Sequence, residues 1–187
     1  MTENNAAMPE SAAARLIRRM LGAARLDVDT YEEVEADRSA TRQAFLVVVL
    51  VALAGGVGTI ANHGAAGIFY HTLSSVALWW VWAGITSLIG TKLLPTPETV
   101  SDHGELLRTI GFSSAPGLLM LLCLVEPIAG YVFGATLLWM LVAMVVAVRQ
   151  ALDYTSTLRA IAVCAIGFPV YLLGLLATIL LLGPWPL

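Results

Sequence analysis

Five long apolar runs dominate this chain, and every basic residue lies on one side of the membrane topology that they imply. The ten basic residues fall into three groups: Arg15, Arg18, Arg19, Arg25, Arg38 and Arg42; Lys92 and Arg108; Arg149 and Arg159. The segments after the first, third and fifth runs, at 62–67, 127–130 and 183–187, contain no Lys or Arg. Positive charge resists translocation, so basic segments stay cytoplasmic. The pattern predicts five spans, with the N-terminus inside and the C-terminus outside.

The composition agrees with this class of protein. Hydrophobic residues make up 58% of the 187 residues and charged residues 12%, and the mean hydropathy is +0.82. Since backbone polar groups in lipid must be paired internally, we predict an all-α, polytopic protein of the cytoplasmic (inner) membrane. A span needs about 20 apolar residues, and we place the spans at about 43–61, 72–91, 107–125, 131–148 and 160–182. The membrane domain is then 43–187, preceded by a cytoplasmic N-terminal segment, 1–42.

Two prolines and one short link shape the expected bundle. Pro116 and Pro169 each remove an internal hydrogen bond and are expected to kink their helices. The link at 126–130 is so short that the third and fourth spans should form a tight antiparallel hairpin.

Small residues at four-residue spacing suggest close helix contacts. Ala54 pairs with Gly58, and Gly130 pairs with Gly134. This spacing places both members on one helix face, where they let two backbones approach closely. We expect packing within the bundle, and an oligomer interface is the alternative.

The N-terminal segment contains a predicted amphipathic helix at 11–26, which Ser11 can cap. One apolar stripe is formed by Leu16, Ile17, Met20, Leu21 and Ala24. Its margins and opposite face carry Arg15, Arg18, Arg19 and Arg25. A basic amphipathic helix suits an anionic lipid surface. Docking on a partner protein, or on the cytoplasmic face of its own bundle, is equally consistent with the pattern.

An acidic stretch, 27–37, follows this helix. It could form a cation site, but a solvated face that is repelled by anionic lipid is the stronger expectation. Tyr31 and Val34, three residues apart, could anchor the stretch to the bundle.

Few residues in the chain could support catalysis or cofactor binding. There is no nucleophile motif, phosphate loop or zinc-helix motif, and no basic and aromatic surface for nucleic acid. His63 and His71 form at best a weak metal pair, and His103 is expected in solvent. We therefore predict no enzyme activity, no metal, no cofactor and no nucleic-acid partner.

Three tryptophans, Trp79, Trp80 and Trp82, fall near the middle of the second span. They could mark a pigment or quinone site. We favour aromatic side chains that pack against protein or face lipid, and their indole N–H groups should then find partners.

Three motifs resemble the Yip domain family (Ypt/Rab-interacting membrane proteins), and within it the bacterial branch. They occupy residues 31–37, 107–118 and 147–153, and the resemblance extends over about 31–182. The most distinctive motif is Gly-Phe-Ser-Ser-Ala-Pro-Gly. The motif positions that we single out are Tyr31, Asp37, Gly111, Phe112, Pro116 and Gly117.

The resemblance implies five helices, a cytoplasmic N-terminus and no enzyme activity. Eukaryotic members act in vesicle traffic, bind small GTPases and form hetero-oligomers. Their Tyr-Gly-Pro type signature is not recognisable here, so GTPase binding is not carried over.

The expected function is that of a non-enzymatic membrane protein that organises membrane components or protein partners. Its partners would be the lipid bilayer and other membrane proteins, in a hetero- or homo-oligomer. One alternative is an accessory or assembly subunit of a larger membrane complex. Another is a small channel or transporter, for which the spans offer mostly Ser, Thr and Gly as polar lining.

Overall fold

A computed structural model describes residues 10–57, 60–99 and 101–182, and in these ranges every regular element is a helix. The elements are α1 (Ala12–Ala24), α2 (Val28–Ala36), α3 (Ala40–Gly56), α4 (Ile60–Leu88), η2 (Ile89–Leu93), α5 (His103–Ser113), η3 (Ala115–Leu124), α6 (Glu126–Ala151) and α7 (Thr157–Leu182). The α-helical class is therefore as predicted.

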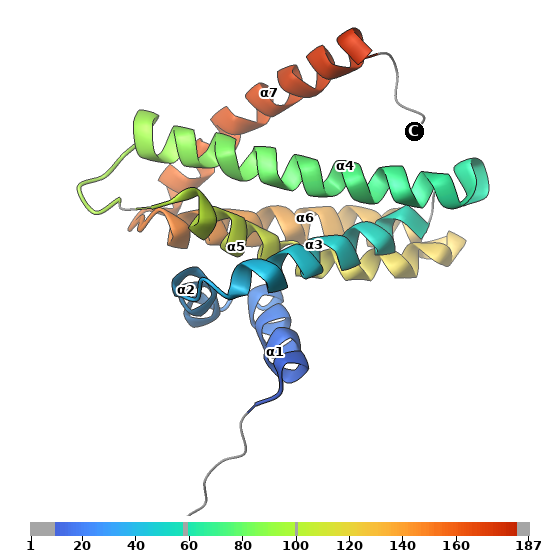
Figure 1. The fold of residues 1–187 in the computed structure, drawn as a ribbon, viewed down its shortest axis with the longest axis horizontal. Coiled ribbons are helices and arrows are strands. Elements are labelled where there is room, and N and C mark those ends of the chain that lie inside the picture. Colours follow the sequence, from blue (N-terminus) through green and yellow to red (C-terminus); the bar gives the residue numbers. More distant parts are fainter. Residues whose placement is uncertain (1–9, 58–59, 100, 183–187) are drawn as a thin grey trace, which may run out of the picture.

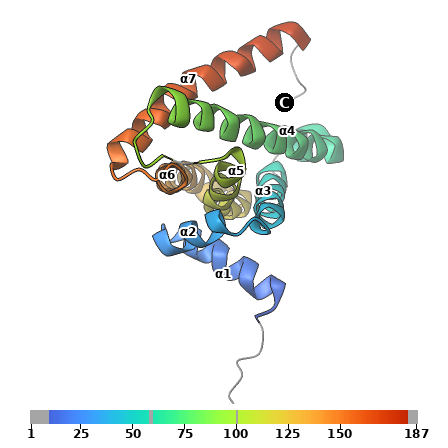
Figure 2. The same cartoon turned by 60° about the vertical axis from the view of Figure 1, so that its left-hand side comes forward.

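The long helices α3, α4 and α6 run roughly along the long axis of the molecule, and α1 projects from their side at a steep angle (Figure 1). The view in Figure 2 shows α1 and α2 on one side of the bundle and α7 on the other. The start of α7 packs on α4 and α6 through three buried residues, Ala160, Val163 and Cys164. The fold is thus a helical bundle with one helix docked across its side.

Local capping explains where two helices begin. The Ser11 hydroxyl accepts from the Ala14 amide at 3.1 Å, which confirms the expected cap of α1. At the start of α5, Asp102 and Glu105 form a reciprocal capping box, with bonds of 2.8 and 2.9 Å. Ser39 holds the N-cap position of α3, but its hydroxyl donates to Asp37 instead of capping the helix.

Among the described residues, three segments are long and apolar enough to cross a membrane: Ala66–Leu93, His103–Leu124 and Glu126–Ala151. A fourth is reached if α2 and α3, which meet at 120°, are counted as one broken span. The part of α7 from Thr157 to Leu173 is a shorter apolar helix. The structure thus supports three to four spans, and five remains a proposal.

Two expected loops are helical. The segment 62–67 belongs to α4, which begins at Ile60. The segment 126–130 is the first turn of α6, so only Val125 separates η3 from α6. Pro127 fits there, because the first amides of a helix have no internal partner and a missing N–H costs nothing.

Pro116 accompanies a change of helix type. The α-helix ends at Ser113, and a 3-10 helix continues from Ala115 to Leu124. The tighter helix pairs each amide with the carbonyl three residues back, so the chain continues in the same span after the proline. Pro169, in contrast, lies inside α7.

Gly130 and Gly134 do not pack within this chain, and our first expectation for them was wrong. No atom lies within 4 Å of a Cβ added at either position. The buried face of α6 carries Thr136 and Ala143. Thr136 lies about 200° around the helix from Gly134, at about 100° per residue. Both glycines therefore point away from the bundle.

The close approaches lie elsewhere. A Cβ on Gly111 would be 2.7 Å from that of Ala44, so α5 and α3 touch at this point. Ala54 is buried, in agreement with internal packing, and its expected partner Gly58 lies outside the described residues.

Candidate functional site: the junction of α1, α2, α3 and α5

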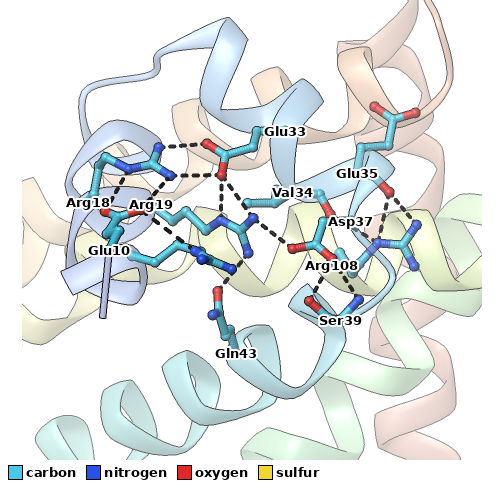
Figure 3. A network of polar contacts seen from close by, with 11 residues as sticks. Glu10, Arg18, Arg19, Glu33, Val34, Glu35, Asp37, Ser39, Gln43 and Arg108 are labelled. Atoms are coloured by element: carbon cyan, nitrogen blue, oxygen red, sulfur yellow. Dashed lines mark hydrogen bonds and ion pairs between the residues drawn. The ribbon is translucent and has the colours of Figure 1, made fainter. Parts of the chain in front are cut away.

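A buried arginine joins three helices. Arg19 of α1 is 3% exposed, and its guanidinium donates to Glu33 Oε1 at 2.9 Å, Asp37 Oδ2 at 2.7 Å and Gln43 Oε1 at 2.8 Å (Figure 3). Glu33 lies on α2, Asp37 ends it, and Gln43 lies on α3. The sequence pattern predicts Arg19 on the margin or polar face of α1. The acidic partners instead draw it into the interior.

Arg18 adds an exposed fork to the same junction. It donates to both carboxylate oxygens of Glu33, at 2.6 and 2.9 Å, and to Glu10 at 3.1 Å. Hydrogen bonds from Arg18, and then from Arg19, hold the pKa of Glu33 at about 2, well below its ordinary value. Hydrogen bonds from Ser39 and Arg19 lower the pKa of Asp37, also to about 2.

Arg108 of α5 binds the C-terminal end of α2. Its Nε donates to the carbonyls of Val34 at 3.0 Å and Glu35 at 2.9 Å, and a further nitrogen reaches Glu35 as well (Figure 3). The last carbonyls of a helix have no internal partner and carry partial negative charge. The buried Arg108 guanidinium gives these carbonyls a hydrogen-bond donor and balances their partial negative charge, and it thereby fixes α2 on α5.

Two aromatic side chains fasten the end of α1 to α6. The Tyr31 hydroxyl lies 3.1 Å from the Ala23 carbonyl and 3.4 Å from that of Ala143. Trp139 Nε1 donates to the Ala24 carbonyl at 2.7 Å. Tyr31 was expected to anchor the acidic stretch, whereas Trp139 gave no signal in the sequence.

The apolar stripe of α1 is divided by this docking. Leu16 and Met20 pack on the core together with Ala23, which is fully buried. Ile17 and Leu21 remain 56% and 51% exposed. The helix therefore docks on its own bundle by one edge of the stripe and leaves the other edge open.

An acidic cleft lies beside the junction, with a volume of about 630 Å³. Its charged lining residues are Glu32, Glu35, Glu105, Arg149 and Asp153. Burial, and then the nearby charges of Asp153 and Glu105, raises the pKa of Glu35 to about 7. Within the described residues, no three His, Cys, Asp or Glu side chains are placed to hold a metal ion.

The acidic stretch is thus not one solvated face. Glu33 and Asp37 are paired with arginines, and Glu35 borders the cleft. His103 also differs from expectation, because its Nε2 is buried and has no hydrogen-bond partner in the described part of the chain. Its ring lies edge-on to Trp80, with centroids 5.2 Å apart.

The motif residues behind the family resemblance build this junction and its support. Tyr31 and Phe112 are fully buried, and Asp37 pairs with Arg19. Pro116 opens η3, and Gly117 leaves room for Val51 of α3. These roles are structural, since they set how α2, α3 and α5 meet.

Comparison with protein-family models matches residues 27–179 to the Yip1 domain. The match begins just before α2, so α1 precedes the domain to which Arg19 binds it. Comparison with curated proteins and with solved structures gives no match. The family match spans 153 of 187 residues (179 − 27 + 1), and the chain therefore belongs to the Yip1 domain family.

Proposed function

We propose that this protein is a non-enzymatic, multi-pass membrane protein that organises membrane components or protein partners through the open edge of α1. Membership of the Yip1 domain family supports a membrane protein of this type. The observation that carries the proposal is the exposure of Ile17 and Leu21 on a helix that is docked through the buried residues Arg19 and Ala23.

The proposed topology has five spans, a cytoplasmic N-terminus and an external C-terminus in the cytoplasmic membrane. The basic links gather at one end of the bundle, which supports it. Arg159 donates to the Pro95 carbonyl at 3.0 Å, and the Tyr154 hydroxyl donates to the Leu94 carbonyl at 2.7 Å. Gln150 reaches Glu32 of α2 at 3.2 Å. One end of the bundle thus collects the segments that should stay inside.

The end of α1 meets the apolar middle part of α6. The last residue of α1, Ala24, accepts from Trp139, and Tyr31 of α2 joins Ala23 to Ala143; these two α6 residues precede the end of α6 at Ala151 by about 12–18 Å at 1.5 Å per residue. The open edge would there meet the bilayer or an apolar surface of another membrane protein.

Charge in α1 favours an apolar contact. Arg15, Arg18 and Arg19 all pair with acidic side chains of the same chain. Ion pairing reduces their attraction for anionic lipid. Ile17 and Leu21 are therefore the residues on which the contact should depend.

The test uses the full-length protein and the double variant Ile17→Ser/Leu21→Ser. Leu158→Ser is the matched control, since Leu158 is an exposed apolar residue near the start of α7. We expect the double variant, and not the control, to lose proteins that co-purify in mild detergent, with thermal melting unchanged. For a lipid contact, amide exchange of α1 in lipid nanodiscs should instead rise in the double variant only. If neither readout changes, α1 has no organising role.

A second candidate is an accessory or assembly subunit. The open space around Gly130 and Gly134 favours it, because a helix of another subunit could approach α6 closely there. Gly134→Leu should then reduce co-purification of the partner subunit. Retention of that subunit would contradict this candidate.

A further inference from the structure

A second cavity, partly open to the surroundings, lies between the helices of the bundle, and its lining includes no residue of α1. Its volume is about 400 Å³, and its lining comes from α3, α4, α5, η3, α6 and α7. Most lining side chains are apolar, including several methionines, and a few carry polar atoms. The residues with polar side-chain atoms are His71, Ser75, Trp79, Trp82, Ser113, Ser114 and Tyr171.

The three serines need no ligand. Each hydroxyl donates to a carbonyl of its own helix, at 2.8, 2.8 and 2.6 Å for Ser75, Ser113 and Ser114. His71 Nδ1 lies 3.0 Å from the Ala52 carbonyl, which can only accept, so this nitrogen must donate. A neutral His71 then carries an acceptor at Nε2.

Trp82 differs from these residues. Its side chain is 9% exposed, and its Nε1–H finds no acceptor among the described residues. The indole is held edge-on to Tyr171, with ring centroids 5.6 Å apart. Nearby Trp79, by comparison, donates to the Leu107 carbonyl at 3.1 Å. A buried indole N–H normally has a partner, so Trp82, which lines the cavity, holds a buried and unused donor.

The dimensions indicate an elongated occupant. His71 and Trp82 border the cavity eleven residues apart on α4, which corresponds to about 16 Å along the helix. A dry apolar cavity of about 150 Å³ accommodates benzene. Small-molecule sites occupy about 300–1,000 Å³ and combine apolar walls with a few polar groups. A cavity of about 400 Å³ falls within that range.

We propose that this cavity binds a membrane lipophile, namely an apolar chain that bears a carbonyl oxygen, and that the oxygen accepts a hydrogen bond from Trp82 Nε1–H. Apolar walls and one unpaired donor match an acceptor on an otherwise apolar molecule. A glycerolipid ester and an isoprenoid quinone both offer this chemistry. The site does not depend on α1, so it stands apart from the organising role proposed above.

The experiment compares full-length wild type with Trp82→Phe, which removes the donor and keeps an aromatic ring. Trp80→Phe is the matched control, because Trp80 lies two residues away with its ring exposed. Native mass spectrometry in mild detergent should show one lipophile bound to wild type and to the control. Loss of one hydrogen bond should weaken binding to Trp82→Phe by about three- to tenfold.

A cavity-filling variant, Ser75→Leu, gives an independent readout. The Ser75 hydroxyl bonds only its own helix, so its loss leaves no orphaned donor elsewhere. We expect Ser75→Leu to displace the lipophile and to melt no lower than wild type. Fragmentation of the extracted molecule identifies an ester, whereas a redox difference spectrum identifies a quinone.

Three results would overturn the site. The first is a wild type that carries no lipophile and takes up neither a short-chain quinone nor a brominated phospholipid. The second is equal loss in Trp80→Phe and Trp82→Phe, which would describe lipid around the outside of the bundle. The third is a bound molecule that survives unchanged in both Trp82→Phe and Ser75→Leu.

Discussion

Arg19 Nη2 lies 2.7 Å from Asp37 Oδ2, and this contact ties a helix that precedes the Yip1 domain to the end of the first helix inside it. Arg19 is buried, whereas both of its carboxylate partners, Glu33 and Asp37, reach the surface. Arg19 makes three hydrogen bonds in the cluster, whereas Glu33 and Asp37 each accept one of them, so the loss of Arg19 removes more of these bonds than the loss of either acid.

Arg19→Met should lower the free energy of unfolding by about 2–3 kcal/mol, because three hydrogen bonds, two of them to carboxylates, are removed together. Arg18→Met is the control. It removes an exposed ion pair and should cost at most about 1 kcal/mol. Denaturation in mixed micelles measures both variants. An equal loss of unfolding free energy in the two variants would mean that the burial of Arg19 adds nothing to stability.

Acid should undock α1. The folded-state pKa values of Glu33 and Asp37, both about 2, lie below their ordinary values. Their contribution is therefore present above about pH 4.5 and is lost as pH falls toward 2. Amide exchange of α1 should rise over this window, while exchange of α6 stays slow. A flat profile for α1 would contradict the proposed ion-pair anchor.

Glu35 should act in the opposite direction. Burial and nearby acids raise the pKa of Glu35 to about 7. The stability that the protonated carboxyl contributes is therefore fully present at pH values below the ordinary pKa of Glu, and it is lost as the pH rises through 7. Glu35→Gln should remove this loss and raise the melting temperature at about pH 8 relative to wild type. Asp29→Asn, an exposed change on the same helix, should leave the profile as it is. A wild-type profile in Glu35→Gln would exclude this residue as the source.

Two glycines should respond oppositely to the same added methyl group. Gly111→Ala pushes against Ala44 of α3 and should lower stability by about 1–3 kcal/mol. Gly134→Ala meets open space and should leave melting unchanged or raise it, since alanine favours a helix. Thermal melting of both variants in detergent decides the matter. A loss at Gly134 as large as that at Gly111 would show that α6 packs differently.

Reporter fusions test the topology. A reporter at Gly64 and one after Leu187 should both be external, and one in the link around Thr96 should be cytoplasmic. The reason is the count of ten basic residues inside and none outside. A cytoplasmic signal at either external site would contradict five spans.

The helical class and the clustering of the basic links could be predicted, because hydropathy and charge are local properties of the sequence. The docking edge of α1 could not. Leu16 and Ile17 are adjacent in one stripe, yet only Leu16 packs on the core. Which edge of the stripe is buried depends on where Glu33 and Asp37 meet Arg19 after folding, and the spacing of apolar residues in α1 carries no information about that contact.

Close packing was predicted at the wrong glycines for a related reason. Four-residue spacing identifies faces that can pack, and Gly130 with Gly134 has it, but so do Gly111 and Ala115. Only the second pair meets a neighbouring helix, because α5 lies inside the bundle and the start of α6 has one open side. The Trp139 contact with α1 likewise arises between residues more than 100 positions apart.

The single residue between η3 and α6 also determines how this chain can enter its membrane. Val125 alone spans about 3.6 Å at most, against a hydrocarbon core about 30 Å thick. With so short a link, one helix cannot span the hydrocarbon core while the start of the other stays on the opposite side of the membrane. In the proposed topology the two helices would therefore enter the lipid together, as one hairpin.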